Sequence, residues 1–235
     1  MKKLNITNKI YVVILLAMII ATAVKFFSYS GWSRYYYGAS VSAPRSYPAH
    51  VRNAFFILKD GDTKPIATSD VNDNRGNWGY GDYQSPRNPD QLPEKLVLEY
   101  TSYRDGLFYA DTISLPLQAI KDAFKAVDKK GINTEQYQAP TVKRFDFVIG
   151  IANKGNIIVW LQGEHNETTL LKYKITPHEP VGDQTYYNGR LPKEQYLQEV
   201  FHIDSALKAD IAKGVDRDAN YIDTPSLFKL RIQQQ

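Results

Sequence analysis

The chain has 235 residues, of which 43% are hydrophobic and 23% are charged, a composition typical of a globular protein with one core. Its net charge of +4 comes from four lysines in the first 25 residues, since the rest of the chain has as many acidic as basic residues. This distribution argues against nucleic-acid binding, and the lack of cysteine excludes disulfides, thiol catalysis, thiolate metal sites and a lipid-modified cysteine.

The N-terminal segment is typical of either a cleaved signal peptide or a single membrane anchor. Ile10 to Val24 is uncharged and apolar, and three lysines precede it. The sequence Ala21-Thr22-Ala23 fits cleavage after Ala23, whereas an apolar stretch extended through Phe27 approaches the length that spans a bilayer. We favour an uncleaved anchor in a bacterial inner membrane, crossed once, with the lysines inside and the chain from Ser28 onward in the periplasm.

Three regions are expected along the chain. Residues 1–27 form the anchor or signal peptide, residues 28–50 an aromatic linker, and residues 51–235 a single periplasmic α+β domain. The aromatic residues of the linker, from Trp32 to Tyr37, are as typical of the lipid headgroup belt as of a first strand that packs its tyrosines on the domain.

The domain opens with a predicted hairpin and a polar loop. Val51 to Lys59 has the content of a buried strand, and the turn at Asp60-Gly61 leads to a short strand near Pro65 to Thr68. Asp70 to Asn77 carries carboxylate and amide oxygens that calcium favours, but the glycine and glutamate of a calcium-binding loop are missing from their positions. A solvated turn is the preferred interpretation, and no metal site is predicted.

The central unit, Pro93 to Lys130, combines a hairpin with a helix. Two predicted strands, Leu96 to Ser102 and Leu107 to Ser114, flank the turn Arg104-Asp105-Gly106. In each strand successive side chains alternate between the two faces. Pro116 then starts an amphipathic helix whose apolar residues recur at helical spacing, namely Leu117, Ile120, Phe124 and Val127. Because one face of this helix must be buried, the pattern predicts an α+β fold with a sheet covered on one face.

A second hairpin supplies the centre of the predicted sheet. Arg144 to Ala152 and Ile157 to Gly163 are apolar at nearly every position, with Trp160 as a large core residue. Thr169 to Thr176 follows as an edge strand, because Lys172 and Lys174 on one face would discourage pairing with another chain.

The C-terminal part is predicted to be helical. Pro192 to Phe201 and Ser205 to Lys213 each carry a narrow apolar stripe, and Asp204 is placed to cap the second helix. Ser226 to Ile232 fits a short strand as well as a short helix. The fold class is therefore α+β: a predominantly antiparallel sheet built from hairpins, an amphipathic helix on one face, C-terminal helices and one N-terminal membrane segment.

No spacing of titratable residues indicates a catalytic or metal site. The histidines, His50, His165, His178 and His202, are far apart in the chain, and each is more typical of the surface than of a ligand set. The sequence contains no nucleophile elbow, phosphate-binding loop or dinucleotide fingerprint. It therefore predicts no catalytic residue and no cofactor.

An aromatic surplus of 17 tyrosines and 3 tryptophans is the remaining signal. Most are expected to pack in the core, but tyrosine is also favoured at protein interfaces because it gives contact area at low entropy cost. Binding surfaces are predicted in the loops from Asp70 to Asn88 and from Val181 to Arg190. The candidate partner-binding residues are Trp78, Tyr80, Tyr83, Tyr186, Tyr187 and Arg190.

Three stretches resemble a known family: Trp78-Gly79-Tyr80-Gly81, the unit from Leu92 to Phe124, and the hairpin from Ile149 to Leu161. Together they are similar to the bacterial family filed as domain of unknown function 2931, over roughly Pro48 to Pro177. The resemblance implies a small exported protein, often a lipoprotein, and some members are similar to immunity proteins encoded beside type VI secretion lipase effectors. This chain lacks the lipid-modified cysteine, and no catalytic residue set comes with the family.

The sequence thus favours a non-enzymatic binding protein, anchored in the inner membrane and facing the periplasm, that occludes a type VI secretion phospholipase effector. The alternative from another class is an envelope structural or ligand-binding protein with no toxin partner. A hydrolase is the third alternative.

Overall fold

The computed structural model describes residues 5–28, 34–75, 77–81, 88–130 and 144–234, which divide between Arg34 and Tyr35 into two compact units. The first unit is the helix α1 (Ile6–Ser28). Its stretch Ile6–Phe26 has a mean hydropathy of 2.1 and is long and apolar enough to cross a membrane. The predicted apolar segment is confirmed as a helix, and a signal sequence and a retained anchor share these properties.

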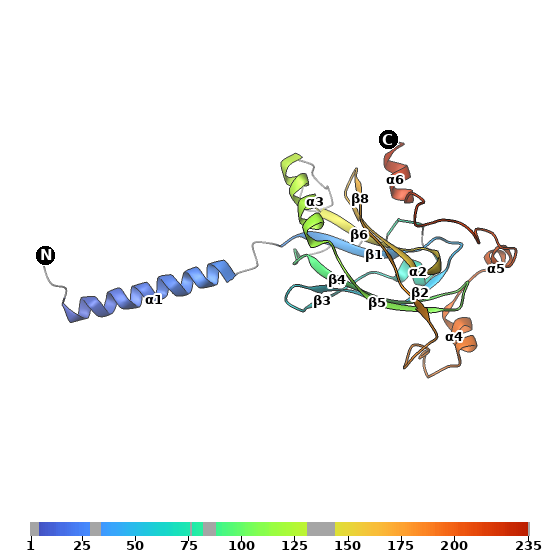
Figure 1. Ribbon diagram of the computed structural model, residues 1–235, viewed down its shortest axis with the longest axis horizontal. Coiled ribbons are helices and arrows are strands. Elements are labelled where there is room, and N and C mark those ends of the chain that lie inside the picture. Colours follow the sequence, from blue (N-terminus) through green and yellow to red (C-terminus); the bar gives the residue numbers. More distant parts are fainter. Residues whose placement is uncertain (1–4, 29–33, 76, 82–87, 131–143, 235) are drawn as a thin grey trace. The chain divides into compact units, whose positions relative to one another are not determined.

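The second unit is an α+β domain with two sheets, where the sequence predicted one (Figure 1). The first sheet has the order β1-β6-β7-β8 and contains one parallel pair, β1 with β6. The second has the order β3-β2-β4-β5-β9 and is antiparallel throughout. The strands are β1 (Tyr36–Ser42), β2 (Ala49–Leu58), β3 (Thr63–Pro65), β4 (Pro93–Ser102), β5 (Phe108–Ser114), β6 (Arg144–Ile151), β7 (Asn156–Gln162), β8 (Glu167–Lys174) and β9 (Pro177–His178).

The main core lies between the two sheets. Strand alternation sends every second side chain of each strand into it, for example Phe147 and Ile149 from β6 and Leu96 and Leu98 from β4. Phe56 of β2 contacts Phe147 with ring centroids 5.3 Å apart, which joins the two sheets directly. The two sheets therefore form a sandwich around one core.

Strands β6 and β7 are buried on both faces, which explains why their sequences are apolar at nearly every position. Residues such as Val148 and Trp160 lie on the side away from the main core, in a second apolar cluster. Gly150 is required there, because a Cβ at this position would lie 2.4 Å from the Trp160 ring. The predictions that these strands are central and that Trp160 is a core residue are confirmed.

The helix α3 (Leu117–Lys130) follows β5 as predicted. Ile120 and Phe124 belong to the core between the sheets, and Phe124 contacts Tyr35 and Phe145, each at 4.8 Å between ring centroids. The Val127 side chain lies outside the described residues. One face of the helix is thus buried, as its sequence pattern required.

Strand β8 is at the edge of its sheet, as the exposed Lys172 and Lys174 predicted. The chain then crosses to the other sheet, where β9 pairs with β5. The Tyr173 hydroxyl donates to Asp111 of β5 over 2.8 Å, so a side chain of the first sheet also bonds to a strand of the second.

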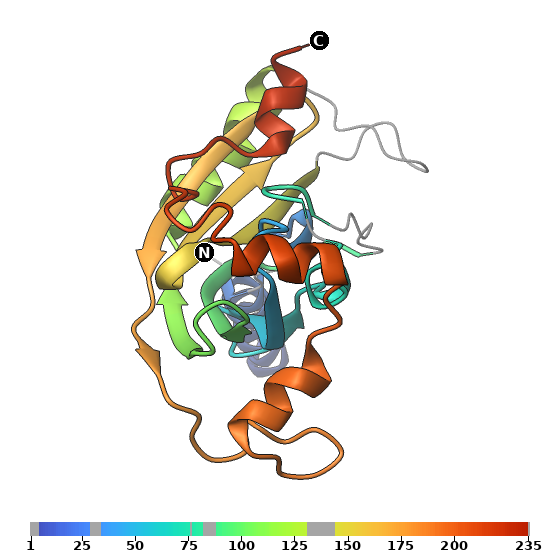
Figure 2. The same cartoon turned by 90° about the vertical axis from the view of Figure 1, so that its right-hand side faces the viewer.

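The C-terminal helices are α4 (Lys193–Val200), α5 (Ser205–Ala212) and α6 (Leu227–Ile232). Asp204 caps α5 as predicted, since its carboxylate accepts from the Leu207 N–H over 2.7 Å. The stretch that the sequence left open is a helix, and Ser226 caps it by accepting from the Lys229 N–H over 2.9 Å. Figure 2 shows these helices together with the segments that connect them.

The polar loop after β3 contains the short helix α2 (Ser69–Asn72). The Asn72 amide accepts from the Val51 N–H over 2.7 Å and donates to the Val51 carbonyl over 2.9 Å. The Asn72 side chain therefore hydrogen-bonds the backbone of strand β2. The sequence had indicated it only as a possible calcium ligand. Within the described ranges, no three His, Cys, Asp or Glu side chains converge.

Candidate functional site

Trp78, a candidate partner-binding residue, is buried, with 5% of its surface exposed. Its ring packs edge to face on Trp160 at 5.0 Å and on Tyr221 at 5.5 Å, and its indole N–H donates to the Thr224 carbonyl over 3.1 Å. The surface role predicted for Trp78 is therefore corrected. The indole fills the outer cluster of the β6–β7 hairpin, where both its apolar surface and its N–H are satisfied.

The glycines beside Trp78 allow this packing. Gly79 has a φ of +69°, and a Cβ there would lie 2.2 Å from the Ser226 Cβ. Its carbonyl accepts from the Gln162 side chain over 2.8 Å. A Cβ on Gly81 would lie 1.7 Å from the Ser40 hydroxyl. The Trp-Gly-Tyr-Gly motif is thus a structural motif that holds the C-terminal segment against the sheet.

Tyr80 is half-buried and also belongs to this contact. Its ring lies 6.3 Å from Phe228, and its hydroxyl accepts from the Arg231 guanidinium, both residues of α6. Tyr83 lies outside the described residues. In the predicted loop from Asp70 to Asn88, Trp78 and Tyr80 therefore pack against the C-terminal part of the same chain.

Tyr186, Tyr187 and Arg190 lie on the segment between β9 and α4, residues 179–192, which we name the tyrosine loop. The structure places all three at the surface, together with Val181. Val181 is 62% exposed, Tyr186 58% and Tyr187 39%. The loop therefore has three large apolar side chains at the surface within seven positions. Of the two loops predicted as binding surfaces, it is the one whose described aromatic side chains are exposed.

Internal hydrogen bonds hold the tyrosine loop in one conformation. Gln184 and Thr185 are buried, and the Gln184 side chain accepts from the Val181 N–H over 2.9 Å. The Tyr187 N–H donates to the Gly189 carbonyl over 2.8 Å, and the Leu191 N–H to the Thr185 carbonyl over 3.1 Å. Buried polar groups with partners fix a loop much as secondary structure does.

Two ion pairs attach this loop to the domain. Arg52 of β2 pairs with Asp183 at 3.0 Å, and Lys193 of α4 pairs with Glu179 at 2.7 Å. Arg190 is exposed, and no carboxylate of the described residues lies within ion-pair distance of it. The loop therefore presents apolar side chains and one cation whose charge is not matched by the described part of the protein.

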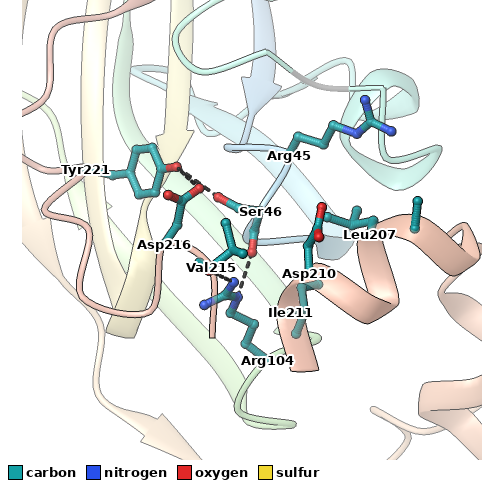
Figure 3. Close-up of a pocket in the computed structure, with 10 residues that line it drawn as sticks. Arg45, Ser46, Arg104, Leu207, Asp210, Ile211, Val215, Asp216 and Tyr221 are labelled. Carbon is teal, nitrogen blue, oxygen red and sulfur yellow. Dashed lines mark hydrogen bonds between the residues drawn. The ribbon is translucent and has the colours of Figure 1, made fainter. Parts of the chain in front are cut away.

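A cavity of about 360 Å³ lies between α5 and the turns that precede β2 and β5 (Figure 3). Its walls carry aliphatic side chains from α5 and the following loop, with Arg45, Arg104, Asp210 and Asp216 around them. The volume falls in the range of small-molecule sites, which begins at about 300 Å³. Local sequence patterns do not indicate this cavity, because the residues that line it come from segments up to 176 positions apart.

Arg104 and Tyr221 organise the cavity. The Arg104 guanidinium donates to the Ser46 carbonyl over 2.6 Å and to the Val215 carbonyl, and it stacks on the Tyr47 ring at 4.4 Å. The Tyr221 hydroxyl hydrogen-bonds Ser46 over 2.8 Å. These contacts use the guanidinium and the hydroxyl to join segments of the chain, so both groups have a structural role.

His50 lies under α4 and differs from the expected surface position. Its ring contacts the rings of Tyr196 and Phe201, with centroids 6.4 and 6.2 Å away, and its buried Nδ1 atom has no hydrogen-bond partner among the described residues. Burial lowers the pKa of His50, and the nearby His202 and Arg52 lower it further. The neutral form of the ring therefore supports the packing of α4 on the second sheet.

Comparison with family models matches residues 30–219 to the family described as "Protein of unknown function (DUF2931)". Comparison with curated proteins and with solved structures gives no significant match. The matched range covers most of the second unit, including the Trp-Gly-Tyr-Gly motif, the tyrosine loop and the residues that line the cavity, except Tyr221.

Proposed function

The chain belongs to the DUF2931 family, and from this premise we propose that it is a non-enzymatic protein whose domain binds a protein partner through the tyrosine loop. The observation that carries the proposal is the exposure of Val181, Tyr186 and Tyr187 on a loop that is held rigid by its own hydrogen bonds. Exposed tyrosines in a fixed conformation are typical of interfaces, because little conformational freedom is lost when they bind.

The proposed location is the inner membrane of a bacterium, with α1 as an uncleaved anchor and the domain in the periplasm. The length and hydropathy of Ile6–Phe26 support a membrane span. The three lysines before Ile10 support an inward-facing N-terminus, because basic residues are retained on the cytoplasmic side. Mass spectrometry of the purified protein tests retention: a mature N-terminus at Val24 would refute the anchor.

The proposed partner is a phospholipase effector of a type VI secretion system, which the domain neutralises by occluding it. The similarity of some family members to immunity proteins supports this identification, and the rigid aromatic loop supports occlusion as the mechanism. An occluding protein needs no catalytic groups of its own, since it acts by filling the space that the substrate would enter.

The test is co-purification with the product of the neighbouring gene, combined with protection of cells that export this product to the periplasm. We expect a stable complex and survival of cells that carry the wild-type chain. If the chain neither binds this product nor protects the cells, the immunity proposal is refuted.

A second candidate function, an envelope protein that binds a small ligand, is favoured by the cavity of about 360 Å³ beside α5. A ligand in this cavity would raise the melting temperature, because it binds only the folded state. Screening periplasmic metabolites by thermal shift, with Ile211→Trp to fill the cavity as a control, distinguishes this function from the first.

A further inference from the structure

We infer that the tyrosine loop enters a concave cleft of the partner, and that this cleft has apolar walls and a carboxylate at its mouth. The inference rests on the proposed function and specifies the chemistry of the partner's surface. The loop is the element that inserts into the cleft, and Arg190 is the group that contacts the carboxylate.

The shape of the loop favours a concave partner. Figure 2 shows the chain between β9 and α4 projecting beyond the sheets at the lower end of the domain. A projecting loop with large exposed side chains buries them efficiently only when the opposite surface surrounds it. Anchor residues of this kind contribute most when they fill a pocket from which water is excluded.

The conformation of the loop favours insertion without rearrangement. Its tip turns through Asn188, with a φ of +52°, and the Tyr187 N–H bonds to the Gly189 carbonyl across this turn. Asp183 holds the other end of the loop to Arg52. Because the side chains of Tyr186 and Tyr187 extend from a backbone that is already ordered, binding loses mainly their side-chain freedom.

The charges of the loop specify the mouth of the cleft. Residues 179 to 193 carry two acids and two bases, and both acids are paired, Glu179 with Lys193 and Asp183 with Arg52. Among the described residues, no carboxylate pairs with Arg190, so the charge of Arg190 is available to a binding partner. A carboxylate facing Arg190 would form a charge-assisted hydrogen bond, and Arg favours such planar partners.

The same charges argue against a lipid surface as the occupant. A segment that binds an anionic bilayer carries a net excess of lysine and arginine, whereas residues 179 to 193 have equal numbers of acids and bases. Tyrosine is compatible with the headgroup region as well as with a protein, so the test includes the lipid case.

The test uses the full chain in nanodiscs and, as the probe, the purified product of the neighbouring gene that the proposed function takes to be a lipase. Dissociation constants are measured by biolayer interferometry for wild type, Tyr186→Ala, Tyr187→Ala and Arg190→Glu. Tyr173→Ala is the matched control, because Tyr173 lies on β8 and is 38% exposed, close to the 39% of Tyr187. We expect each tyrosine variant to bind about tenfold or more weakly, and the control to bind as wild type does.

Arg190 has its own readout. Arg190→Glu should slow association and weaken binding more at low salt than at high salt, and Arg190→Lys should retain part of the affinity, because a lost charge contact is screened by ions. Equal affinity of wild type and Arg190→Glu at every salt concentration would contradict the carboxylate.

The outcomes separate the inference from the function on which it rests. If the wild type binds the lipase and the tyrosine variants bind equally well, the inference is overturned and the proposed function stands. If the wild type does not bind, the proposed function fails and the inference falls with it. Protection of residues 179–192 from hydrogen exchange by phosphatidylglycerol nanodiscs without lipase would assign the loop to the membrane and overturn the inference.

Discussion

Two aromatic regions of the domain, the Trp-Gly-Tyr-Gly motif and the tyrosine loop, have similar compositions but differ in burial. Both combine aromatic residues with glycine in a polar part of the chain. Trp78 is buried on Trp160, whereas Tyr186 is mostly exposed. The difference arises from what lies opposite each region: the motif faces the outer side of a hairpin that is apolar on both faces, and the tyrosine loop faces no such surface.

This contrast shows how the glycines of an aromatic loop differ between a packed and an exposed region. The glycines of the motif permit close approach, since a Cβ on Gly79 or Gly81 would collide with the chain. In the tyrosine loop a Cβ on Gly182 or Gly189 would meet no atom within 4 Å. Glycine that creates space for packing therefore marks the structural region, and glycine that only shapes a turn marks the exposed one.

The largest expected effect tests the structural region. Trp160→Ala removes the ring on which Trp78 packs and should destabilise the domain by about 3–5 kcal/mol, the range for a large buried aromatic residue. Urea unfolding of the full chain in detergent, followed by circular dichroism, measures this loss. A change below about 1 kcal/mol would show that the outer cluster is not a core.

A smaller effect is expected at Gly150, which lies on the neighbouring strand β6 directly against this ring. Gly150→Ala places a methyl group where the Trp160 ring lies, and overpacking of this kind typically destabilises by about 1–3 kcal/mol. Gly182→Ala adds the same methyl group in open space, although its φ of +60° adds some strain. Equal destabilisation by the two variants would contradict the close approach at Gly150.

The packing of α4 on the second sheet should depend on pH. The pKa of His50 is lowered in the folded domain, first by burial and then by His202 and Arg52. Below the ordinary histidine pKa of about 6.5 the unfolded chain therefore binds more protons, and stability falls as the pH decreases through this range. Above about pH 7 this contribution is constant, because His50 is neutral in both states.

The melting temperature at pH 7.5 and at pH 5.5 measures this dependence. His50→Phe keeps an aromatic ring against Tyr196 and Phe201 and should reduce the loss of stability at the lower pH. His165→Phe is the control, because the His165 side chain is 67% exposed. A pH dependence that is unchanged in His50→Phe would show that another group is responsible.

The smallest expected effect on stability is in the tyrosine loop itself. Tyr186→Ala should change the free energy of unfolding by no more than about 0.5 kcal/mol, because the side chain is mostly exposed. The same variant is expected to weaken partner binding, so stability and affinity separate in this region. A loss of stability as large as that of Gly150→Ala would place Tyr186 in a packing role and remove the contrast between the two regions.

Most secondary structure was predictable, because it depends on local patterns. The hairpin strands, the amphipathic helix from Leu117, the cap at Asp204 and the lysine-bearing edge strand all follow from side-chain periodicity and short-range hydrogen bonding. The α+β class followed from these elements. The exposed candidates Tyr186, Tyr187 and Arg190 were also identified, since a polar loop with aromatic residues has few ways to bury them.

The sequence by itself thus determined the elements, the apolar N-terminal helix and the exposure of one of the two candidate loops. Tertiary structure decided the division into two sheets, the parallel pairing of β1 with β6, the burial of Trp78 and the cavity beside α5. The physical reason is that periodicity reports which side of an element is apolar, but not which distant segment covers it. Trp78 meets Trp160 and Thr224 across 82 and 146 positions, and only the folded chain brings them together.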